Sequence, residues 1–351
     1  MFRKILFLII ITFAFIVGYF SRGKIENLKN QVSQDKQNNP ISDRSLDKYT
    51  IENLKKANFT VSDFKITKIL KEGESFNSYL FSFRFNPNLD GKTFKNVSGQ
   101  INLPSIKESK FIKEKFPVIL MLRGFINQKT YKTGDGTRNA SEYFAKNGFI
   151  TIAPDFLGYG ESDKEAGNIF ESRFQTYVTA ISLLKYLENN PEIIFENNKY
   201  KTSSNIFIWG HSNGGQIALT ILEISGKEYP TTLWAPVSKS FPYSILYYTD
   251  ESEDKGKLIR SELAKFESEY DVEKYSLTNY LDKINAPLQI HQGENDQAVP
   301  KSWSDNLVSI LRKKGKKINY FTYENTDHNM RPNWNKVIEE DLKFFKKYIE
   351  D

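Results

Sequence analysis

The sequence contains no cysteine, and this absence excludes disulfide bonds, thiolate metal sites and cysteine nucleophiles. Histidine is also scarce, since His211, His291 and His328 are the only three in 351 residues. They are spread over more than a hundred positions and do not form the clustered ligand pattern of a zinc site. We therefore expect no metal site.

Strong charge of one sign is missing from most of the chain. The formal net charge is +6, but residues 1–60 hold ten Lys or Arg and five Asp or Glu and so supply five of these charges. The other 291 residues are nearly neutral, which argues against an extended phosphate-binding face. Nucleic acid is not an expected partner. With 39% apolar and 14% aromatic residues, the chain can bury a substantial core.

The N-terminus carries an apolar run. After Arg3 and Lys4, the sixteen residues from Ile5 to Phe20 are uncharged, slightly fewer than the roughly 20 that cross a bilayer core. The run ends without the small-residue pattern of a cleavage site, so we interpret residues 1–22 as a signal anchor, with a cleaved secretory signal as the alternative. Positive charge before the run then places the rest of the chain outside the cytoplasm, membrane-anchored or, alternatively, secreted.

The rest of the sequence divides into a polar linker and a globular domain. Residues 23–49 are rich in Asn, Gln and Lys and cannot bury enough apolar surface to fold, which indicates a linker. From residue 50 to residue 351 the pattern is globular. It starts with alternating apolar and polar residues in "FTVSDFKITKIL" and "SYLFSFRF", typical of antiparallel strands.

Strand-length apolar runs then alternate with helical patterns. The expected strands are residues 116–122, 149–154, 205–210, 231–236, 287–292 and 318–323. Helices are expected over 171–190, after residue 212, over 302–315 and over 334–350. Buried strands separated by helices predict an α/β fold, in which a mostly parallel sheet has helices on both faces.

The segment Gly210-His211-Ser212-Asn213-Gly214 fits the pattern G-x-S-x-G between an expected strand and an expected helix. In this setting the serine lies at a sharp turn, and flanking residues without Cβ let strand and helix approach. The hydroxyl then faces the N-terminus of a helix, which favours developing negative charge. Ser212 is the candidate nucleophile.

A serine hydroxyl needs a base that works near neutral pH, normally histidine. His211 adjoins the serine, so the turn directs its side chain elsewhere, and we expect it to pack or to line the site. His291 lies inside an expected strand, which favours a structural role. His328 follows the last expected strand, where the carboxyl ends of parallel strands gather active-site loops, and is the candidate base.

The base requires a carboxylate to orient it. Asp296 follows the strand over 287–292 and is the preferred candidate, with Glu294 and Asp327 as alternatives. The oxyanion formed in acyl transfer needs two N–H donors. We expect these to be the backbone N–H groups of Asn213 and of Phe125, the latter in the loop after the strand over 116–122.

Residues 95–350 resemble the α/β-hydrolase superfamily and, within it, the catalytic domain of the prolyl-oligopeptidase-like (peptidase S9-type) serine hydrolases and esterases. The motifs that carry the resemblance are "GQINLP", "VILMLRGF", "APDFLGYGESD", "GHSNGG", "LDKINAPLQIHQGENDQAVP" and "DHNMRPNW". Two features depart from the family. Arg123-Gly124 stands where many relatives have His-Gly, and residues 50–100 are too few for the β-propeller of the large peptidases.

The resemblance also implies a small helical lid over residues 239–285. Related peptidases use a tyrosine as an additional oxyanion donor, and Tyr131 is the candidate here. Arg123 is a candidate either for contact with the substrate or for a structural ion pair, and Trp234 is a further candidate for contact with the substrate.

Together these features predict a serine hydrolase that cleaves carboxylic ester or peptide bonds through an acyl-enzyme, with no metal or organic cofactor. Its expected partners are a small ester or peptide substrate and the membrane that holds the N-terminal segment. Two alternatives stay open, namely an acyltransferase with the same triad and a binding protein that kept the fold without catalysis.

Overall fold

The computed structural model describes residues 44–105, 115–195, 198–251 and 254–349. Residues Leu46–Asp351 form one compact unit. The expected anchor over 1–22 and most of the expected linker lie outside the described residues. Within the described part of the chain, none of the helices has both the length and the apolar character needed to cross a membrane.

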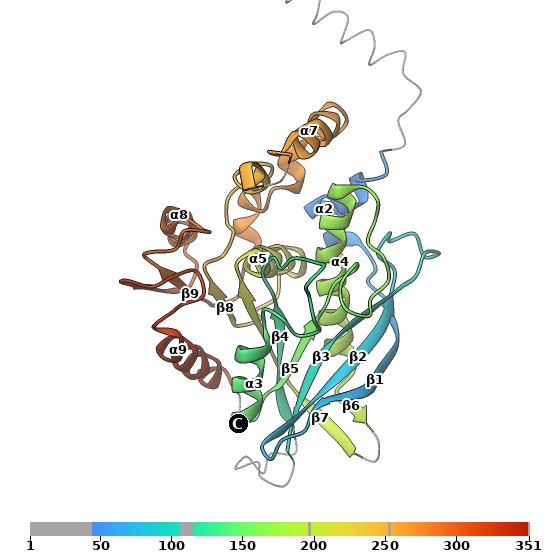
Figure 1. Ribbon diagram of the computed structural model, residues 1–351, viewed down its shortest axis with the longest axis vertical. Helices are drawn as coiled ribbons and strands as arrows, with labels where there is room; N and C mark the ends of the chain where they lie inside the picture. Colours follow the sequence, from blue (N-terminus) through green and yellow to red (C-terminus); the bar gives the residue numbers. More distant parts are fainter. Residues whose placement is uncertain (1–43, 106–114, 196–197, 252–253, 350–351) are drawn as a thin grey trace, which may run out of the picture. The chain divides into compact units, whose positions relative to one another are not determined.

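A ten-stranded mixed sheet is the centre of the unit (Figure 1). Its spatial order is β1-β2-β3-β5-β4-β7-β8-β9-β10, and β6 pairs with β7 to the side. The strands are β1 (Val61–Lys71), β2 (Phe76–Phe85), β3 (Lys95–Pro104), β4 (Phe116–Leu122), β5 (Ile150–Pro154), β6 (Glu192–Phe195), β7 (Asn198–His211), β8 (Thr231–Trp234), β9 (Leu288–Gly293) and β10 (Ile318–Tyr323).

The pairing of neighbouring strands changes once along the sheet, from antiparallel to parallel. The first three strands are antiparallel, and β3 pairs antiparallel with β5. From β5 to β10 every neighbouring pair along the sheet is parallel. The expected α/β class with an antiparallel start is therefore confirmed, and the carboxyl ends of the parallel strands share one edge.

Helices cover both faces of this sheet (Figure 1). On β4, Val118 and Leu120 pack in one hydrophobic cluster and Ile119 and Met121 in the other, as the period of two in a strand requires. The helices α4, α5 and α8 contribute to the first cluster, and α3 and α9 to the second. These five helices are α3 (Arg138–Lys146), α4 (Ile169–Asn189), α5 (Asn213–Ser225), α8 (Lys301–Lys313) and α9 (Trp334–Lys347).

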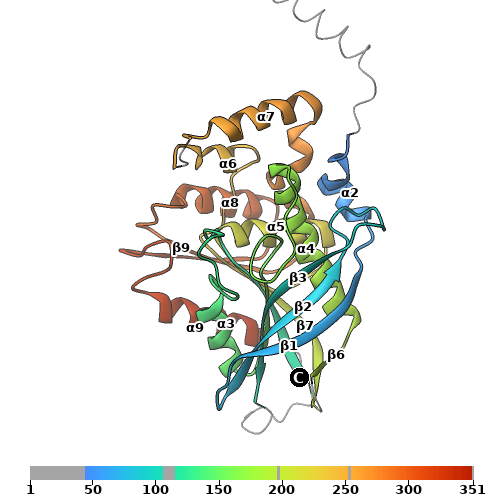
Figure 2. The ribbon, with the colours of Figure 1, turned by 45° about the vertical axis from the view of Figure 1, so that its right-hand side comes forward.

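Three further helices lie outside this layering. One is α2 (Ile51–Lys56), near the start of the unit. The other two, α6 (Tyr243–Leu246) and α7 (Lys257–Glu269), belong to the segment between β8 and β9, which also contains several short 3-10 turns. Figure 2 shows α6 and α7 together above α8. The expected insertion over 239–285 is thus helical, while its role as a lid remains a prediction.

Candidate active site

Ser212 lies at the turn between β7 and α5 in a strained conformation. Its φ is +56° and its ψ is −120°, a region that costs a non-glycine residue on the order of 1–3 kcal/mol. The turn is held by its backbone, since Ser212 N–H donates to Trp234 O at 2.8 Å and Ser212 O accepts from Val237 N–H at 3.0 Å. Gly214 makes the turn possible, because a Cβ there would lie 1.9 Å from Leu122 O. The sequence therefore places this serine at the carboxyl edge of the parallel strands.

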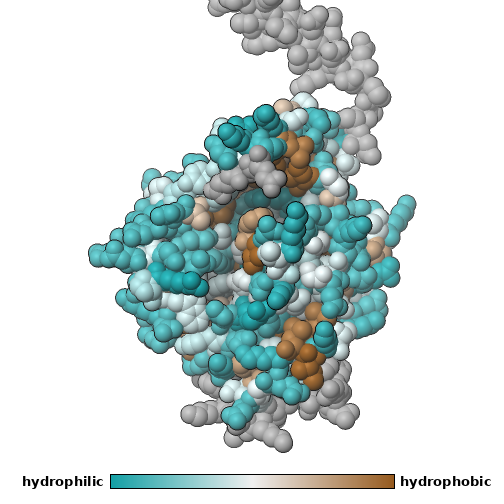
Figure 3. Space-filling model, in the orientation of Figure 1, coloured by the Kyte–Doolittle hydropathy of each residue, from teal (hydrophilic) through white to brown (hydrophobic). Residues whose placement is uncertain are grey.

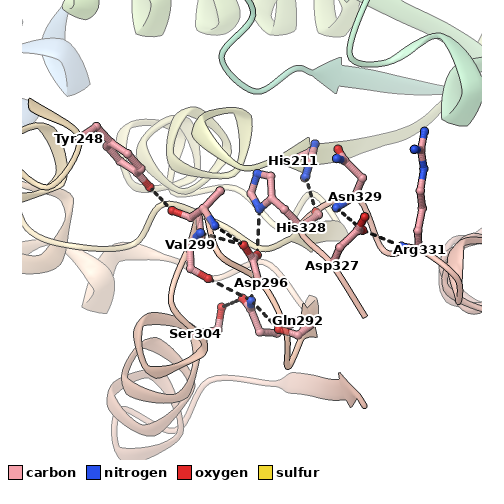
Figure 4. A network of polar contacts seen from close by, with 12 residues as sticks. His211, Tyr248, Gln292, Asp296, Val299, Ser304, Asp327, His328, Asn329 and Arg331 are labelled. Atoms are coloured by element: carbon pink, nitrogen blue, oxygen red, sulfur yellow. Dashed lines mark hydrogen bonds and ion pairs between the residues drawn. The ribbon is translucent and has the colours of Figure 1, made fainter. Parts of the chain in front are cut away.

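Asp296 and His328 come together from the loops after β9 and β10 (Figure 4). His328 Nδ1 lies 2.8 Å from Asp296 Oδ2, and the carboxylate also accepts from the N–H groups of Ala298 and Val299 at 2.9 and 2.8 Å. Burial disfavours the charged form of Asp296. The hydrogen bond and charge of His328, with the two N–H groups, outweigh burial and hold the pKa of this carboxyl below its ordinary value.

Gln292 and Ser304 hold this carboxylate in place. Gln292 Nε2 donates to Asp296 Oδ2 at 3.1 Å, and Gln292 Oε1 accepts from Ser304 Oγ at 2.7 Å. Asp327, one of the alternative acids, uses Oδ1 to accept from the N–H groups of Asn329 and Arg331 and so shapes its own turn (Figure 4). Asp296, and not Asp327, contacts the imidazole of His328.

His211 links the serine turn to the His328 loop. His211 Nε2 lies 2.9 Å from His328 O, and the two ring centroids are 4.6 Å apart. Burial, and then the charge of His328 when protonated, lowers the pKa of His211 to about 4, so this ring is neutral at physiological pH. The neutral Nε2–H donates to the carbonyl of His328, which brings the residue before Ser212 against the candidate base. Sequence reasoning expected His211 to pack, but it did not identify this contact.

The loop after β4 lies against the serine. A Cβ on Gly124 would be 3.0 Å from Ser212 Cβ and 3.5 Å from Ser212 Oγ, so a larger residue would press against the serine side chain. Among the described residues, the N–H groups of Phe125 and Asn213 donate no hydrogen bond. Both are therefore available as oxyanion donors. The Ser212 hydroxyl likewise has no hydrogen-bond partner within the described part of the chain, so its link to His328 belongs to the functional proposal.

Arg123 and Tyr131 hold this loop in place. Arg123 is buried and donates to Gly124 O at 3.0 Å and to Asp155 O at 2.8 Å, with its guanidinium 4.0 Å from the ring centroid of Tyr159. The Tyr131 hydroxyl donates to Asp155 Oδ1 at 2.6 Å. Arg123 and Tyr131 were both expected near the substrate, but their side chains form hydrogen bonds within the protein itself. Their contacts position the loop that follows β4.

Asp155 is the residue that sequence reasoning missed. It follows β5 and also accepts from Ser98 Oγ at 2.6 Å and Thr133 Oγ1 at 2.9 Å. Burial raises the pKa of this carboxyl, although the three hydroxyl donors oppose the rise. The sequence feature that could have identified Asp155 is an acidic residue directly after a buried parallel strand, in "APDFLG".

Trp234 and His291 belong to a buried network. Trp234 Nε1 donates to Asp341 Oδ2 at 2.7 Å, while His291 Nε2 lies 2.8 Å from Asp341 Oδ1 and His291 Nδ1 lies 2.8 Å from Tyr323 Oη. The indole N–H of Trp234 is thus engaged with the protein rather than free for a substrate. His291 has the structural environment expected for it.

Comparison with known proteins agrees with this architecture. The family model for the prolyl oligopeptidase family matches residues 136–351, so the chain belongs to this family of hydrolases. Two curated relatives are similar in sequence. The uncharacterized peptidase YtmA of Bacillus subtilis (strain 168) is 26% identical over 56% of this chain and 70% of that protein. The dipeptidyl peptidase family member 6 of Caenorhabditis elegans is 25% identical over 36% of this chain and 18% of that protein.

Solved structures share the fold. An acetyl xylan esterase from Paenibacillus sp. R4 superposes with a TM-score of 0.61 at 15% identity, covering 88% of this chain and 95% of that one. A puromycin-hydrolyzing peptidase of Mycobacterium tuberculosis gives a TM-score of 0.55 at 17% identity, covering 82% of this chain and 39% of that one. The expected α/β-hydrolase fold is confirmed, and both esterases and peptidases are among its neighbours.

Proposed function

We propose that the protein cleaves carboxylic ester or amide bonds through an acyl-enzyme on Ser212. His328 accepts the proton of the Ser212 hydroxyl as Oγ attacks the substrate carbonyl, and the N–H groups of Asn213 and Phe125 bind the resulting oxyanion. His328 then gives this proton to the leaving group as the bond to the carbonyl carbon breaks. Water attacks the acyl-enzyme with proton transfer to His328, and His328 then returns this proton to Ser212 Oγ as the bond to the acyl carbon breaks and the acid leaves.

One observation carries this proposal. The loop that bears His328, whose imidazole is hydrogen-bonded to Asp296, contacts through His211 the same turn that holds Ser212 at a positive φ. Strain at a single serine is unfavourable and persists where the surrounding structure fixes it, which is typical of nucleophile turns.

Apolar groups near this edge of the sheet favour a substrate with an apolar acyl chain. The Phe125 side chain, in the loop after β4 that approaches Ser212, is 79% exposed, and Tyr243 on α6 and Tyr247 directly after this helix are also exposed. Figure 3 shows the surface hollowed below the region of α6 and α7, with apolar side chains beside the hollow. Aromatic residues are enriched at binding surfaces relative to the rest of a protein surface.

A fluorophosphonate probe tests the nucleophile. We expect stoichiometric labelling of the folded wild-type protein, located at residue 212 by peptide mass spectrometry. Ser212→Ala should abolish labelling, and Ser225→Ala at the other end of α5 should leave it unchanged. Absence of labelling in the intact protein would exclude Ser212 as an activated nucleophile.

Substrate panels then separate the alternatives within this chemistry. Short-chain esters, long-chain esters and aminoacyl amides, with Ser212→Ala as the blank, decide between an esterase and a peptidase. Adding acceptor alcohols and measuring the ratio of transfer to hydrolysis tests the acyltransferase alternative.

We also propose that residues 1–22 anchor the enzyme in a membrane with the catalytic unit outside the cytoplasm. The support is the apolar run preceded by Arg3 and Lys4. Retention of the full chain in carbonate-washed membranes, with its catalytic unit cleaved by protease added to intact spheroplasts, is the expected result. Recovery of the full chain in the soluble fraction would contradict it.

A further inference from the structure

One hydrogen bond joins the helical insertion to the loop that bears Asp296. Tyr248 lies two residues after α6, and its hydroxyl donates to the carbonyl oxygen of Ala298 at 3.0 Å (Figure 4). Within the described part of the chain, no other group donates to this carbonyl. The mechanism proposed above gives this tyrosine no part, although the residue that it contacts is only two positions from Asp296.

The carbonyl of Ala298 belongs to the same peptide unit as the N–H of Val299. This N–H donates to Asp296 Oδ1 at 2.8 Å, and Asp296 Oδ2 lies 2.8 Å from His328 Nδ1. A chain of three hydrogen bonds therefore runs from the hydroxyl of Tyr248 to the imidazole of His328 through one planar peptide group. Bonds in such a chain strengthen one another, because a carbonyl that accepts a hydrogen bond makes the N–H of the same peptide a stronger donor.

Packing against α8 holds the ring of Tyr248 where this chain begins. Its centroid lies 6.3 Å from that of Trp303, edge to face, and the ring of Tyr247 lies 4.9 Å from the same indole. Ser238, which precedes α6, donates from Oγ to the carbonyl of Trp303 at 3.1 Å. The insertion is thus attached to the first turn of α8 both before and after α6, and α8 begins directly after the loop of Asp296.

An aromatic core fixes the same part of the insertion on α4. Phe241 is buried, and its ring centroid lies 5.8 Å from that of Phe170 and 6.0 Å from that of Phe174, both on α4. The N–H of Phe241 donates to Ser276 Oγ at 3.1 Å, which ties this core to the later part of the insertion. Close-packed side chains transmit displacement instead of absorbing it, so the segment that bears Tyr248 is a firm support.

We propose that Tyr248 is a positioning residue for the candidate base, a role that rests on the proposed function. Through the peptide group that joins Ala298 to Val299, its hydroxyl fixes the carboxylate of Asp296. Asp296 in turn holds the imidazole of His328 in the orientation and tautomer that a base requires. The hydroxyl therefore acts on the base through Asp296 and makes no contact with the substrate.

Tyr248→Phe in the full-length protein removes the hydroxyl and keeps the ring that packs against Trp303. We expect kcat for 4-nitrophenyl acetate to fall by about five- to tenfold, the effect of one hydrogen bond, with KM within about twofold of wild type. The fall should be the same for 4-nitrophenyl octanoate, because a residue in contact with the acyl chain would affect the longer ester more. Tyr275→Phe is the matched control, since this tyrosine of the insertion bonds to Asp47, and it should keep the wild-type kcat.

A double-mutant cycle with Asp296→Asn tests the route by which the hydroxyl acts. Because the amide no longer orients the imidazole correctly, Tyr248→Phe should lower kcat by less than about twofold when Asp296→Asn is already present. Equal losses in the two backgrounds would overturn the proposal. A raised KM at unchanged kcat would also overturn it, since Tyr248 would then act on the substrate and not on the base.

The proton between His328 and Asp296 gives a readout that needs no turnover. Its downfield proton resonance, assigned by its loss in His328→Gln, should shift in Tyr248→Phe and stay unchanged in Tyr275→Phe. A shift in a protein that no fluorophosphonate labels would keep the link between Tyr248 and His328 and reject the hydrolase. Labelling and hydrolysis with an unshifted resonance and an unchanged kcat in Tyr248→Phe would reject the role of this tyrosine and leave the hydrolase standing.

Discussion

The molecule contains two histidine–aspartate pairs with the same separation and different surroundings. His328 Nδ1 lies 2.8 Å from Asp296, and His291 Nε2 lies 2.8 Å from Asp341. Both carboxylates are fully buried, but the His328 side chain is 19% exposed and the His291 side chain is 0% exposed. The distance between the partners therefore does not distinguish a reactive pair from a structural one.

The second ring nitrogen is what differs. His291 uses both nitrogens, one with Asp341 and one with the Tyr323 hydroxyl, and Asp341 also accepts from Trp234 and Gln289. His328 uses Nδ1 with Asp296, and within the described residues its Nε2 has no partner. A base needs a free nitrogen that faces the reacting group, whereas a ring with both nitrogens engaged contributes to stability.

Replacing Ser212 or its proposed base His328 should have the largest effect on activity. We expect Ser212→Ala and His328→Gln each to lower kcat by on the order of 10⁴-fold, because the nucleophile or its base is lost while the binding surface remains. Ester hydrolysis, with chemical denaturation as the check on folding, measures both. The free energy of unfolding of His328→Gln should fall by only about 1 kcal/mol, because the glutamine amide can still donate to Asp296, which also keeps the N–H groups of Ala298 and Val299. Retention of a tenth of the activity in His328→Gln would mean that another group is the base.

Removing the charge of Asp296, the partner of His328, should lower kcat less. Asp296→Asn keeps the size of the side chain, but its amide no longer favours the protonated imidazole or the tautomer with Nδ1–H. We expect kcat to fall by about 10³-fold, with part of the loss recovered at higher pH. Asp327→Asn is the matched control, because that carboxylate contacts backbone N–H groups and not the ring of His328. A comparable loss in both variants would identify a general charge effect in place of orientation by Asp296.

The same substitution in the buried pair should change stability instead of activity. His291→Gln breaks the contacts with Asp341 and Tyr323 and leaves a buried carboxylate short of one partner. We expect a loss of about 3 kcal/mol in the free energy of unfolding, with kcat within threefold of wild type well below the unfolding temperature. Urea denaturation and ester hydrolysis on one preparation measure both quantities. A large loss of kcat at unchanged stability would mean that the His291–Asp341 pair also acts in catalysis.

The sequence was sufficient for the features that depend on short segments. The bounds of β4 and β10 agree with the expected ranges of 116–122 and 318–323, because each is a run of strand-forming residues with clear ends. The G-x-S-x-G turn is a local pattern, and scarcity of histidine allowed His328 to be selected by elimination. Asp296 could be preferred because acids after β9 are few.

Features that join distant segments could not be predicted in this way. Arg123, Tyr131 and Asp155 belong to three loops, and only the folded sheet brings them into one network. The first seven residues of β7, from Asn198, are mostly polar, so the expected strand at 205–210 was too short by seven residues at its start. The indole of Trp234 was expected at the substrate because its bond to Asp341, 107 positions away, has no local signature.

His211, the third histidine, makes the stability of the folded protein depend on pH. An unfolded chain protonates His211 below about pH 6.5, but the folded protein does not do so until about pH 4. The unfolded state therefore binds more protons across this interval, so the stability contributed by His211 is fully present above pH 6.5 and is lost as the pH falls to 4. At pH 5.5 the loss should be about 1 kcal/mol. Asp296 has the opposite type of charge and a lowered pKa, so its contribution is lost only below the ordinary range of an aspartate, outside this interval.

His211→Gln isolates this effect. Glutamine retains an N–H that can reach the carbonyl of His328 but does not titrate. We expect the variant to lose less stability than wild type between pH 7 and pH 5, by about 1 to 2 kcal/mol in urea denaturation at constant ionic strength. Arg84→Gln, which replaces an exposed arginine on β2, should reproduce the wild-type slope. Parallel curves of stability against pH for wild type and His211→Gln would show that His211 accepts its proton as readily in the folded state as in the unfolded chain. The contact between the serine turn and the His328 loop would then be open to water rather than buried.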